Sequence, residues 1–288
     1  MNNTIKLQIV TGMSGSGKTI ALHTLEDMGY YCIDNLPVSI LEAVALHLTD
    51  EPEAIFSKTA VGIDARSQSS QIPMLPELVQ NMRSQGLDCN VLFLDAQNET
   101  LIKRFSETRR KHPLTDGVRS LDEAIQHERL LLQPLSTTAD LRIDTSHTNL
   151  HELRDMIHSR ISGKTTQASI LFESFGFKHG VPRDADFVFD VRCLPNPHWQ
   201  AALRPHTGLD QPVADFLNSH QSTHDMLRDL TAFFERWIPT FEADGRSYLT
   251  IAIGCTGGQH RSVYLVDRLS HHFKTAGLQV MSRHRELS

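Results

Sequence analysis

The sequence has few cysteines and no long apolar run, and each scarcity excludes a class of protein. The cysteines, four in all, form no C-x-x-C pair, which argues against a disulfide framework and a cysteine-ligated zinc site. No apolar stretch approaches the length needed to span a bilayer, and the first residues lack the apolar core of a signal peptide. We therefore expect a cytoplasmic protein that makes no contact with a membrane.

Positive charge is scarce as well. The 28 lysines and arginines are outnumbered by 34 aspartates and glutamates, and the net charge is −6. A field that draws polyanions to the whole surface is thereby excluded, so any nucleic acid must bind at a local basic patch. What the chain does have is length and apolar content, since 288 residues that are 40% hydrophobic suffice for two packed domains.

Strand-like and helix-like segments alternate through the first half of the chain. Strands are expected at residues 6–11, 30–34, 59–64, 90–95 and 141–145. Helices are expected at residues 18–28, 38–48, 75–85, 98–111, 121–133 and 150–161. This alternation predicts an α/β fold with a parallel sheet, right-handed crossovers and helices on both faces.

Small and polar residues at 161–168 interrupt this pattern. We therefore expect two domains, residues 1–162 and residues 163–288. The pattern of the second half predicts a smaller α/β domain. Its strands are expected at 169–175, 186–191, 248–254 and 278–282, and its helices at 225–241 and 260–276.

A glycine-rich motif follows the first expected strand. Residues 12–19 read GMSGSGKT and match the pattern G-x-x-x-x-G-K-[ST] between a strand and a helix. Glycines allow such a P-loop to turn its backbone N–H groups onto phosphates at the positive end of the helix. Lys18 is expected to reach the β- and γ-phosphates, and the hydroxyl of Thr19 to ligate Mg²⁺. The motif predicts a site for a nucleoside triphosphate, completed by Gly12, Met13, Ser14, Gly15, Ser16 and Gly17.

A carboxylate should complete this site at the end of a neighbouring strand. Asp34 ends the second expected strand, where ligands of open sheets collect, so we expect it to hold the metal and to act with Lys18 and Thr19 in catalysis. The alternative is an aspartate that opens a turn. The segment Asp64-Ala65-Arg66-Ser67 ends the third expected strand at the same edge, where Arg66 would meet a phosphate or Asp64 a base, unless it is a plain loop.

Five basic residues lie in or just after one expected helix. They are Lys103, Arg104, Arg109, Arg110 and Lys111. Such residues form a lid over the phosphates in small P-loop kinases, but they equally suit a solvated helix face, and the sequence favours neither interpretation. The loop also leaves open whether the γ-phosphate passes to water or to a small-molecule acceptor, so a kinase is an alternative function.

A second glycine-rich turn joins strand to helix at residues 254–262, GCTGGQHRS. It is suited to an anion, and its spacing C-x-x-G-x-x-R-S also matches a tyrosine-phosphatase loop in which the Cys255 thiolate attacks phosphorus. Gly254 stands where such enzymes commonly carry a histidine, and Asp190 is the one candidate for a general acid. We therefore favour a phosphate or phosphosugar site in which Cys255 is buried.

Together these motifs resemble the RapZ/YvcJ family of bacterial nucleotide-binding proteins, the RNase adapter family. The resemblance is carried by five segments that span nearly the whole chain. They are GMSGSGKT at 12–19, IDNLP at 33–37, DARS at 64–67, SFGFKHGVPRDADFVFDVRCLPNP at 174–197 and GCTGGQHRS at 254–262.

The resemblance implies a fold and an activity for each half. The first half would be a kinase-like P-loop domain that hydrolyses ATP and GTP, with residues 64–67 as a GTP-associated segment. The second would resemble the sugar-phosphate-binding part of phosphofructokinase. In enteric members this domain senses glucosamine-6-phosphate and presents a small RNA to RNase E. A regulatory protein is therefore expected, which binds glucosamine-6-phosphate or UDP-N-acetylglucosamine and forms a homo-oligomer.

The same resemblance assigns residues to the second domain. By matching motifs, the ligand pocket would consist of Asp190, Arg192, Asn196, Thr256, Gly257, His260 and Arg261. Enteric members carry a tail rich in lysine and arginine that assists RNA binding, and this sequence does not show one. A weaker RNA surface is therefore expected, formed by Lys274, Arg283 and Arg285.

Overall fold

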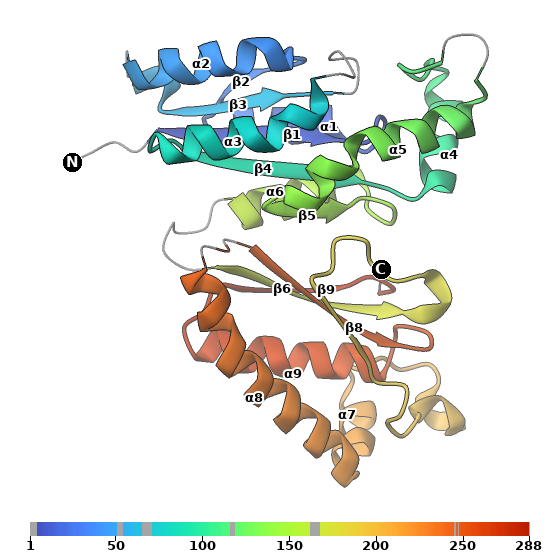
Figure 1. The fold of residues 1–288 in the computed structure, drawn as a ribbon. Coiled ribbons are helices and arrows are strands. Elements are labelled where there is room, and N and C mark those ends of the chain that lie inside the picture. Colours follow the sequence, from blue (N-terminus) through green and yellow to red (C-terminus); the bar gives the residue numbers. More distant parts are fainter. Residues whose placement is uncertain are drawn as a thin grey trace. The chain divides into compact units, whose positions relative to one another are not determined.

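Two compact units, Met1–Ser162 and Gly163–Ser288, make up the chain. The computed structural model describes residues 5–50, 54–64, 71–115, 119–161, 168–244, 246 and 248–287. Each unit is built on its own parallel sheet, as Figure 1 shows. The expected α/β fold, with a larger and a smaller parallel-sheet domain, is confirmed.

The first unit has a five-stranded sheet in the order β2-β3-β1-β4-β5. All neighbouring strands run parallel. The strands are β1 (Lys6–Gly12), β2 (Tyr31–Ile33), β3 (Lys58–Gly62), β4 (Asp88–Asp95) and β5 (Leu141–Asp144). The helices are α1 (Lys18–Asp27), α2 (Val38–Asp50), α3 (Leu75–Ser84), α4 (Asn98–Thr108), α5 (Leu121–Thr138) and α6 (Leu150–Ile161). Short 3₁₀ turns lie at Ala54–Phe56 and Ile72–Met74.

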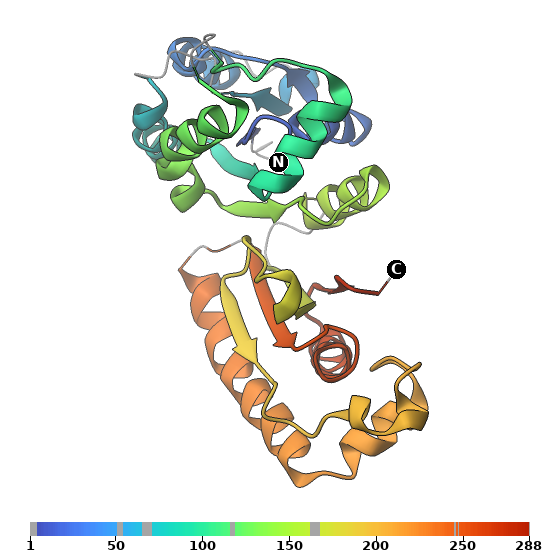
Figure 2. The same cartoon turned by 90° about the vertical axis from the view of Figure 1, so that its right-hand side faces the viewer.

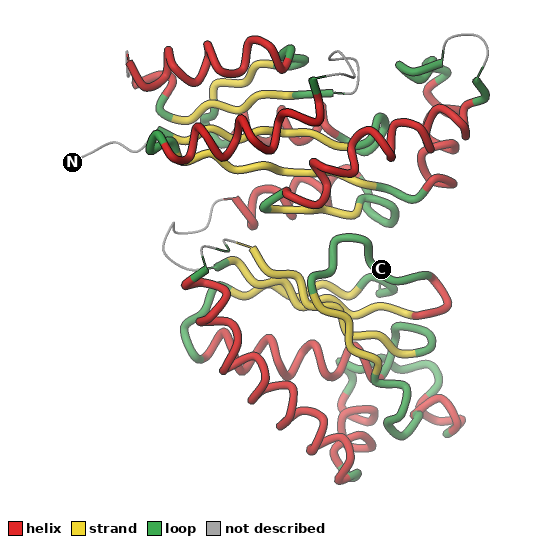
Figure 3. Tube along the Cα trace, in the orientation of Figure 1, coloured by secondary structure: helices red, strands yellow, loops and turns green. Residues whose placement is uncertain are grey.

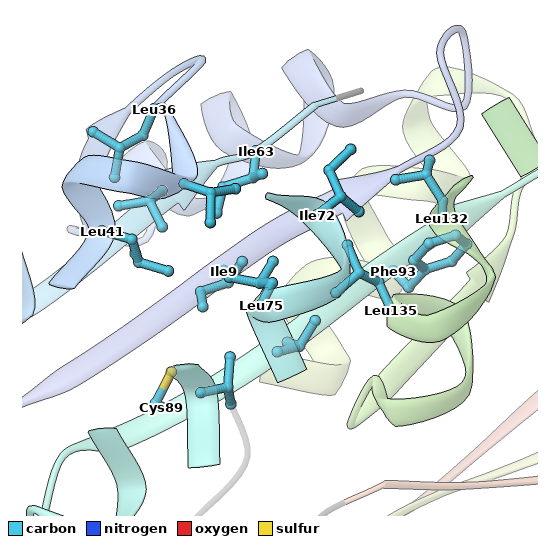
Figure 4. Close-up of a cluster of buried hydrophobic side chains, with 14 of the residues drawn as sticks. Ile9, Leu36, Leu41, Ile63, Ile72, Leu75, Cys89, Phe93, Leu132 and Leu135 are labelled. Atoms are coloured by element: carbon cyan, nitrogen blue, oxygen red, sulfur yellow. The ribbon is translucent and has the colours of Figure 1, made fainter. Parts of the chain in front are cut away.

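Helices cover both faces of this sheet, because both sides of the central strands are apolar. On one face Ile9 of β1 packs with Leu41 of α2, Leu75 of α3 and Leu132 of α5 in a single buried cluster (Figure 4). On the other face α1 packs against β1 and α6. Since parallel strands share one carboxyl edge, the loops that follow β1, β4 and β5 gather there, as the green segments of Figure 3 show.

The second unit has a four-stranded parallel sheet in the order β7-β8-β6-β9. Its strands are β6 (Ser169–Gly176), β7 (Phe187–Asp190), β8 (Tyr248–Cys255) and β9 (Val280–His284). Its helices are α7 (Gln211–Asn218), α8 (Gln221–Ala243) and α9 (Arg261–Thr275), with 3₁₀ turns at Phe177–His179, Pro197–Trp199 and Ala201–Leu203. No helix in the described part of the chain is long and apolar enough to cross a membrane.

Aromatic side chains fill the core between this sheet and its long helices. Phe172 of β6 stacks on Phe273 of α9 and meets Phe234 of α8 edge to face, with both pairs of ring centroids 5.7 Å apart. Figure 2 shows α8 and α9 running beside these strands. The packing holds the amino end of α9, and the glycine-rich turn before it, against the carboxyl end of β8.

Two helices of the first unit differ clearly in length from the prediction, and in the second unit the helix expected at 225–241 extends over Gln221–Ala243. The helix expected at 98–111 ends at Thr108, because Arg109 takes a left-handed conformation with φ 51°. The helix expected at 121–133 continues to Thr138 through Pro134. Proline removes the hydrogen bond to the carbonyl four residues earlier, and Leu130 at that position is 69% exposed, so water can solvate its carbonyl.

Gly12 provides a test of how tightly the loop after β1 is packed. Its φ is +135°, and a Cβ added there would lie 2.1 Å from the carbonyl oxygen of Leu94. Gly86 also has a positive φ, +90°, but a Cβ there would meet nothing within 4 Å. In urea unfolding followed by circular dichroism, Gly86→Ala should lower the free energy of unfolding by about 1 kcal/mol, from backbone strain alone. Gly12→Ala should lower it by more than about 3 kcal/mol. Equal losses would contradict the close packing of Gly12.

Candidate phosphate-binding sites

The loop between β1 and α1 is a compact turn at the carboxyl edge of the first sheet. Met13 N–H donates to Leu94 O at 3.0 Å, and Ser16 N–H donates back to Met13 O at 3.1 Å. Gly17 is left-handed, with φ 106°, and α1 starts at the next residue. The Nζ of Lys18 donates to Gly12 O at 2.7 Å and to Met13 O at 3.2 Å, so this side chain lies along the loop.

A cavity of about 670 Å³ opens over this loop. That volume lies in the range of sites for cofactor-sized ligands. Ser14, Gly15, Ser16, Gly17, Lys18 and Thr19 form its floor, and Arg110, Lys111 and Pro113 contribute from beyond α4. Thr148, Asn149 and Leu150 contribute from the start of α6. The backbone of the loop, its lysine and its threonine therefore face one ligand-sized space.

Three consecutive loop residues are held by three different elements. Ser14 donates from its N–H and its hydroxyl to Glu128 of α5, at 2.9 and 2.7 Å. The carbonyl of Gly15 accepts from Arg104 of α4 at 3.0 Å. The carbonyl of Ser16 accepts from the hydroxyl of Thr145, just after β5, at 3.0 Å. The loop conformation is thus fixed from outside the motif.

Glu128 is the most deeply buried ionisable group at this site. Its side chain and that of His112 are both 0% exposed, and Nε2 of His112 lies 3.0 Å from Oε2 of Glu128. Burial raises the pKa of Glu128, but the hydrogen bonds from His112 and Ser14 and the charge of Lys18 outweigh it, so the pKa lies below its ordinary value. The group is therefore a carboxylate at neutral pH.

The basic residues in and after α4 take different positions, so neither interpretation from the sequence applies to all of them. Arg104 is partly buried and also donates to the carbonyl of Thr145 at 2.6 Å, which makes it a support of the loop. Arg110 and Lys111 are exposed and line the cavity. Lys103 is 77% exposed and lies 4.0 Å from Glu107, on the solvated face of the helix.

Of the two candidate carboxylates, Asp64 lines the cavity and Asp34 does not, among the residues that are described. Asp64 is 7% exposed and follows β3, the strand next to β1. Asn35, with its amide nitrogen turned toward Asp64, donates to both carboxylate oxygens at 3.2 Å. Asp34 is exposed after β2, one strand further out. Ala65, Arg66 and Ser67 lie outside the described residues.

The donors present suit a metal ion that is bound chiefly through a nucleotide. Within the described ranges no group of three histidine, cysteine or acidic side chains is arranged to hold a metal. Mg²⁺ in P-loop sites takes one protein hydroxyl, the oxygens of phosphates, and waters that a carboxylate orients. Thr19 and the nearly buried Asp64 line the same cavity and present a hydroxyl and a carboxylate there.

The second glycine-rich turn, between β8 and α9, is built around Cys255. The thiol is 3% exposed, accepts the N–H of Gly258 at 3.2 Å and lies 3.2 Å from the hydroxyl of Ser262. Burial raises its pKa, but these hydrogen bonds and the charge of Arg261 outweigh burial and lower the pKa below the ordinary value for a thiol. A histidine at Gly254 has no room, because a Cβ there would lie 2.5 Å from the ring of Phe175.

Arg261 begins α9, and its side chain is hydrogen-bonded to other parts of the protein. One terminal nitrogen donates to the carbonyls of Arg192 and Leu194, at 2.7 and 3.0 Å, and the other to the hydroxyl of Thr256 at 3.2 Å. It is 4% exposed, and its Nε finds no hydrogen-bond partner within the described residues. The guanidinium therefore ties the turn after β7 to the turn after β8.

His260 precedes α9 and is neutral at pH 7. Burial, together with His198, lowers its pKa although the ring also bonds to the backbone at Leu203 and His206. Nε2 is buried and has no hydrogen-bond partner among the described residues. In a neutral ring this nitrogen either donates or accepts, depending on the tautomer.

The other expected pocket residues surround this turn. Asp190 and Arg192 form an exposed ion pair at 2.7 Å, and Arg192 lies over the ring of Phe177. The hydrogen bond from Arg192 lowers the pKa of Asp190. Asn196 accepts from the backbone of His198, whose ring is 6.2 Å from that of His260. Gly257 lies at the bend of the turn, with the side chain of Lys178 3.9 Å from its Cβ position.

Two of the three residues expected to bind RNA are used inside the second unit. Arg283 pairs with the buried Glu173 at 3.1 Å. The side chain of Arg285 is 3% exposed and donates to the carbonyls of His179 and Gly180. Lys274 is exposed on α9. The sequence shows the charge of Arg283 and Arg285 but not the groups that bind them in the fold.

A glycine-rich loop between strand and helix, at the carboxyl edge of a parallel sheet of order 2-3-1-4-5, defines a P-loop protein. Residues 5–165 match the model of the RapZ-like N-terminal domain, and residues 168–288 match that of the RapZ C-terminal domain. The chain belongs to the RapZ family, which confirms the resemblance seen in the sequence.

Individual relatives agree over the full length. A nucleotide-binding protein of Methylococcus capsulatus is 54% identical over 286 residues, which cover 98% of this chain and 96% of that protein. One of Alkalilimnicola ehrlichii is 52% identical and covers 99% of both. Among solved structures, shikimate kinase from Acinetobacter baumannii in complex with shikimate is 18% identical, with a TM-score of 0.38, and covers 56% of this chain and 94% of that one.

Sequence reasoning missed Glu128, His112 and Thr145 as supports of the P-loop. One signal was present: the buried stripe of α5 runs through Ala124, Ile125, Glu128, Leu132 and Leu135, so a glutamate stands at a position of the apolar face. A charged residue on such a stripe indicates a buried, specifically paired group. Thr145 offered no comparable signal, because its role depends on the ends of two strands meeting.

The lowered pKa of Glu128 predicts a pH dependence of stability. A carboxyl whose pKa falls on folding stabilises the protein above its unfolded-state value, and this contribution is lost as the pH falls through the folded-state value. The free energy of unfolding of the parent protein should therefore fall more steeply than that of Glu128→Gln between about pH 6 and pH 3. Urea titrations at several pH values measure both curves. Parallel curves would contradict an ionised Glu128 in the folded protein.

Proposed function

We propose that the first unit binds a nucleoside triphosphate with Mg²⁺ and hydrolyses ATP and GTP as a regulatory activity. The observation that carries this is the cavity over the loop, into which the loop backbone, Lys18 and Thr19 all face. The start of α1 adds the positive end of a helix dipole. The names of the close relatives, which call them nucleotide-binding proteins, support the same proposal.

Each polar group has a role in this proposal. Lys18 would exchange its bonds to Gly12 O and Met13 O for oxygens of the β- and γ-phosphates. Arg110 and Lys111 would neutralise charge that develops on the phosphates during transfer. Thr19 and Asp64 would hold Mg²⁺, and this ion would neutralise negative charge on the phosphates. We place Asp64 in the role expected for Asp34, because Asp64 lines the cavity.

Water is the acceptor in this proposal. Transfer to a small molecule, as in a kinase, requires a second site beside the γ-phosphate. The cavity of about 670 Å³ suits one nucleotide. The polar side chains of its described lining that have no role above include Glu107 and Thr108 of α4 and Thr148 and Asn149 before α6, which come from two separate segments. Hydrolysis is therefore the simpler assignment.

Replacing Lys18 with alanine tests the first site. Lys18→Ala should lower the rate of ATP and GTP hydrolysis at least about 100-fold, because one preorganised charge on the phosphates is removed. Lys103→Ala is the matched control, since Lys103 is 77% exposed and pairs only loosely with Glu107. Phosphate release under multiple turnover, with equal secondary structure checked by circular dichroism, measures both. An unchanged rate in Lys18→Ala would refute the assigned site.

For the second unit we propose a phosphorylated amino sugar, glucosamine-6-phosphate or UDP-N-acetylglucosamine, as the ligand. The turn at 255–260 offers backbone N–H groups to a phosphate. The Nε of the buried Arg261 has no hydrogen-bond acceptor among the described residues and can donate to a bound ligand. The unpartnered Nε2 of His260 and the carboxylate of Asp190 suit the hydroxyl and ammonium groups of a sugar.

A phosphatase reaction at Cys255 fits the geometry less well. The lowered pKa of the thiol favours it, but the thiol is 3% exposed and the guanidinium of Arg261 is already bonded to two backbone carbonyls. Small-RNA binding, with presentation to RNase E, is a weaker proposal that rests on the family resemblance. Of its three expected residues, Lys274 alone is exposed, beside Arg268 and His271 on α9.

Calorimetric titration of the full chain tests the second site. Glucosamine-6-phosphate and UDP-N-acetylglucosamine are compared with inorganic phosphate, and saturable binding of one sugar is expected to be tighter than that of phosphate. His260→Ala should weaken the sugar about tenfold or more, because a hydrogen-bonded group is lost from a buried site. His271→Ala, an exposed residue of α9, is the control and should bind as the parent does. If phosphate binds as tightly as either sugar, the sugar assignment is wrong.

A further inference from the structure

The buried carboxyl group beneath the P-loop joins two parts of the nucleotide site, and no step of the proposed function uses it. Ser14 donates to Glu128 twice, and Nε2 of His112 lies 3.0 Å from the same carboxyl. Both buried side chains are 0% exposed. Ser14 of the P-loop and His112 of the segment after α4 are thus both hydrogen-bonded to one buried carboxylate.

The hydrogen bond at Nδ1 of His112 shows which ring nitrogen carries the proton. The N–H of Leu114 donates to Nδ1 at 3.2 Å, so Nδ1 is an acceptor and the ring proton is on Nε2. Nε2 therefore donates to Glu128, whose carboxylate accepts three hydrogen bonds in all. Loss of one donor leaves a buried charge under-bonded, which costs more than the bond itself. The three groups are therefore held in fixed relation.

His112 follows directly on the two cations that line the cavity. Arg110 and Lys111 are its neighbours in the chain. Its ring also packs against Phe105 of α4, with the ring centroids 5.1 Å apart. His112 is thus fixed by α5 on one side and by α4 on the other. Its position limits where Arg110 and Lys111 can lie relative to the loop.

We propose that Glu128 is a positioning residue of the nucleotide site, which sets Ser14 in the P-loop and, through His112, holds Arg110 and Lys111 over the same cavity. Glu128 is not among the residues that line the cavity, so it acts through these neighbours. Its oxygens accept from Ser14 and His112, and the opposite charge that acts on it is that of Lys18 in the same loop.

Binding of ATP and of GTP with Mg²⁺ to the full chain, measured by calorimetry, tests this proposal. Glu128→Ala removes all three acceptor contacts and should raise Kd about tenfold or more. Glu128→Gln is the matched control. Its amide oxygen can accept from the Ser14 N–H and from His112 while its NH₂ donates to the Ser14 hydroxyl, so Kd should stay within about threefold of the parent.

A double-mutant cycle separates positioning from a general loss of structure. His112→Ala and Arg110→Ala should each raise Kd. Together they should raise it by less than the product of the two factors, because Arg110 is already misplaced once His112 is gone. His112→Gln keeps a donor close to the place of Nε2 and should bind as the parent does. If Glu128→Ala does not fold, shown by circular dichroism, the cycle and the two glutamine variants decide the matter.

This inference rests on the proposed nucleotide binding, and the two fail in different ways. If the parent binds neither ATP nor GTP, or Lys18→Ala binds as tightly as the parent, the proposed function fails and the inference fails with it. If the parent binds and Lys18→Ala does not, the proposed function stands. The inference alone is then overturned if His112→Ala binds like the parent, or if its effect and that of Arg110→Ala simply multiply.

Discussion

A buried negative charge is the constraint on which the first unit depends. Glu128 has no exposure to water, so its carboxylate must be satisfied inside the protein or the fold loses free energy. All three of its hydrogen bonds come from parts of the nucleotide site, two from Ser14 and one from His112. The packing of α5 and the conformation of the P-loop therefore depend on each other, because the buried carboxylate of Glu128 needs the donors of Ser14 and His112.

The two glycine-rich turns share a strand–turn–helix form but are stabilised by different chemistry. The loop at 12–19 is held from behind by Glu128, Arg104 and Thr145, which leaves its lysine and the nearby cations facing a cavity. The turn at 255–260 is held from within, by the thiol of Cys255 and the guanidinium of Arg261. The first arrangement leaves positive side chains facing the cavity, whereas the second uses its thiol and its guanidinium for hydrogen bonds within the protein.

Sequence reasoning located the strands and the loop because these follow from local patterns. Alternation of apolar strands and amphipathic helices is sufficient for a parallel sheet. Helix α7 was missed because its eight residues are fewer than the window over which a helical period is recognised. The choice between Asp34 and Asp64 could not be made locally, since it depends on β3 lying next to β1 while β2 lies further out. For the same reason Arg283 and Arg285 looked free, although Glu173 and two backbone carbonyls bind them in the fold.

Spacing alone also misleads about what a conspicuous side chain does. The pattern C-x-x-G-x-x-R-S places an arginine shortly after a cysteine across a strand-to-helix turn, but it does not state where the guanidinium points. In the fold the carbonyls of Arg192 and Leu194 bind that guanidinium, because the turn after β7 ends beside β8 and leaves two acceptors that need a donor. The charge of Arg261 still lowers the pKa of Cys255, so the electrostatics of a nucleophile are present without its access to substrate. A motif therefore specifies a local geometry, and the neighbouring strand decides whether that geometry serves chemistry or structure.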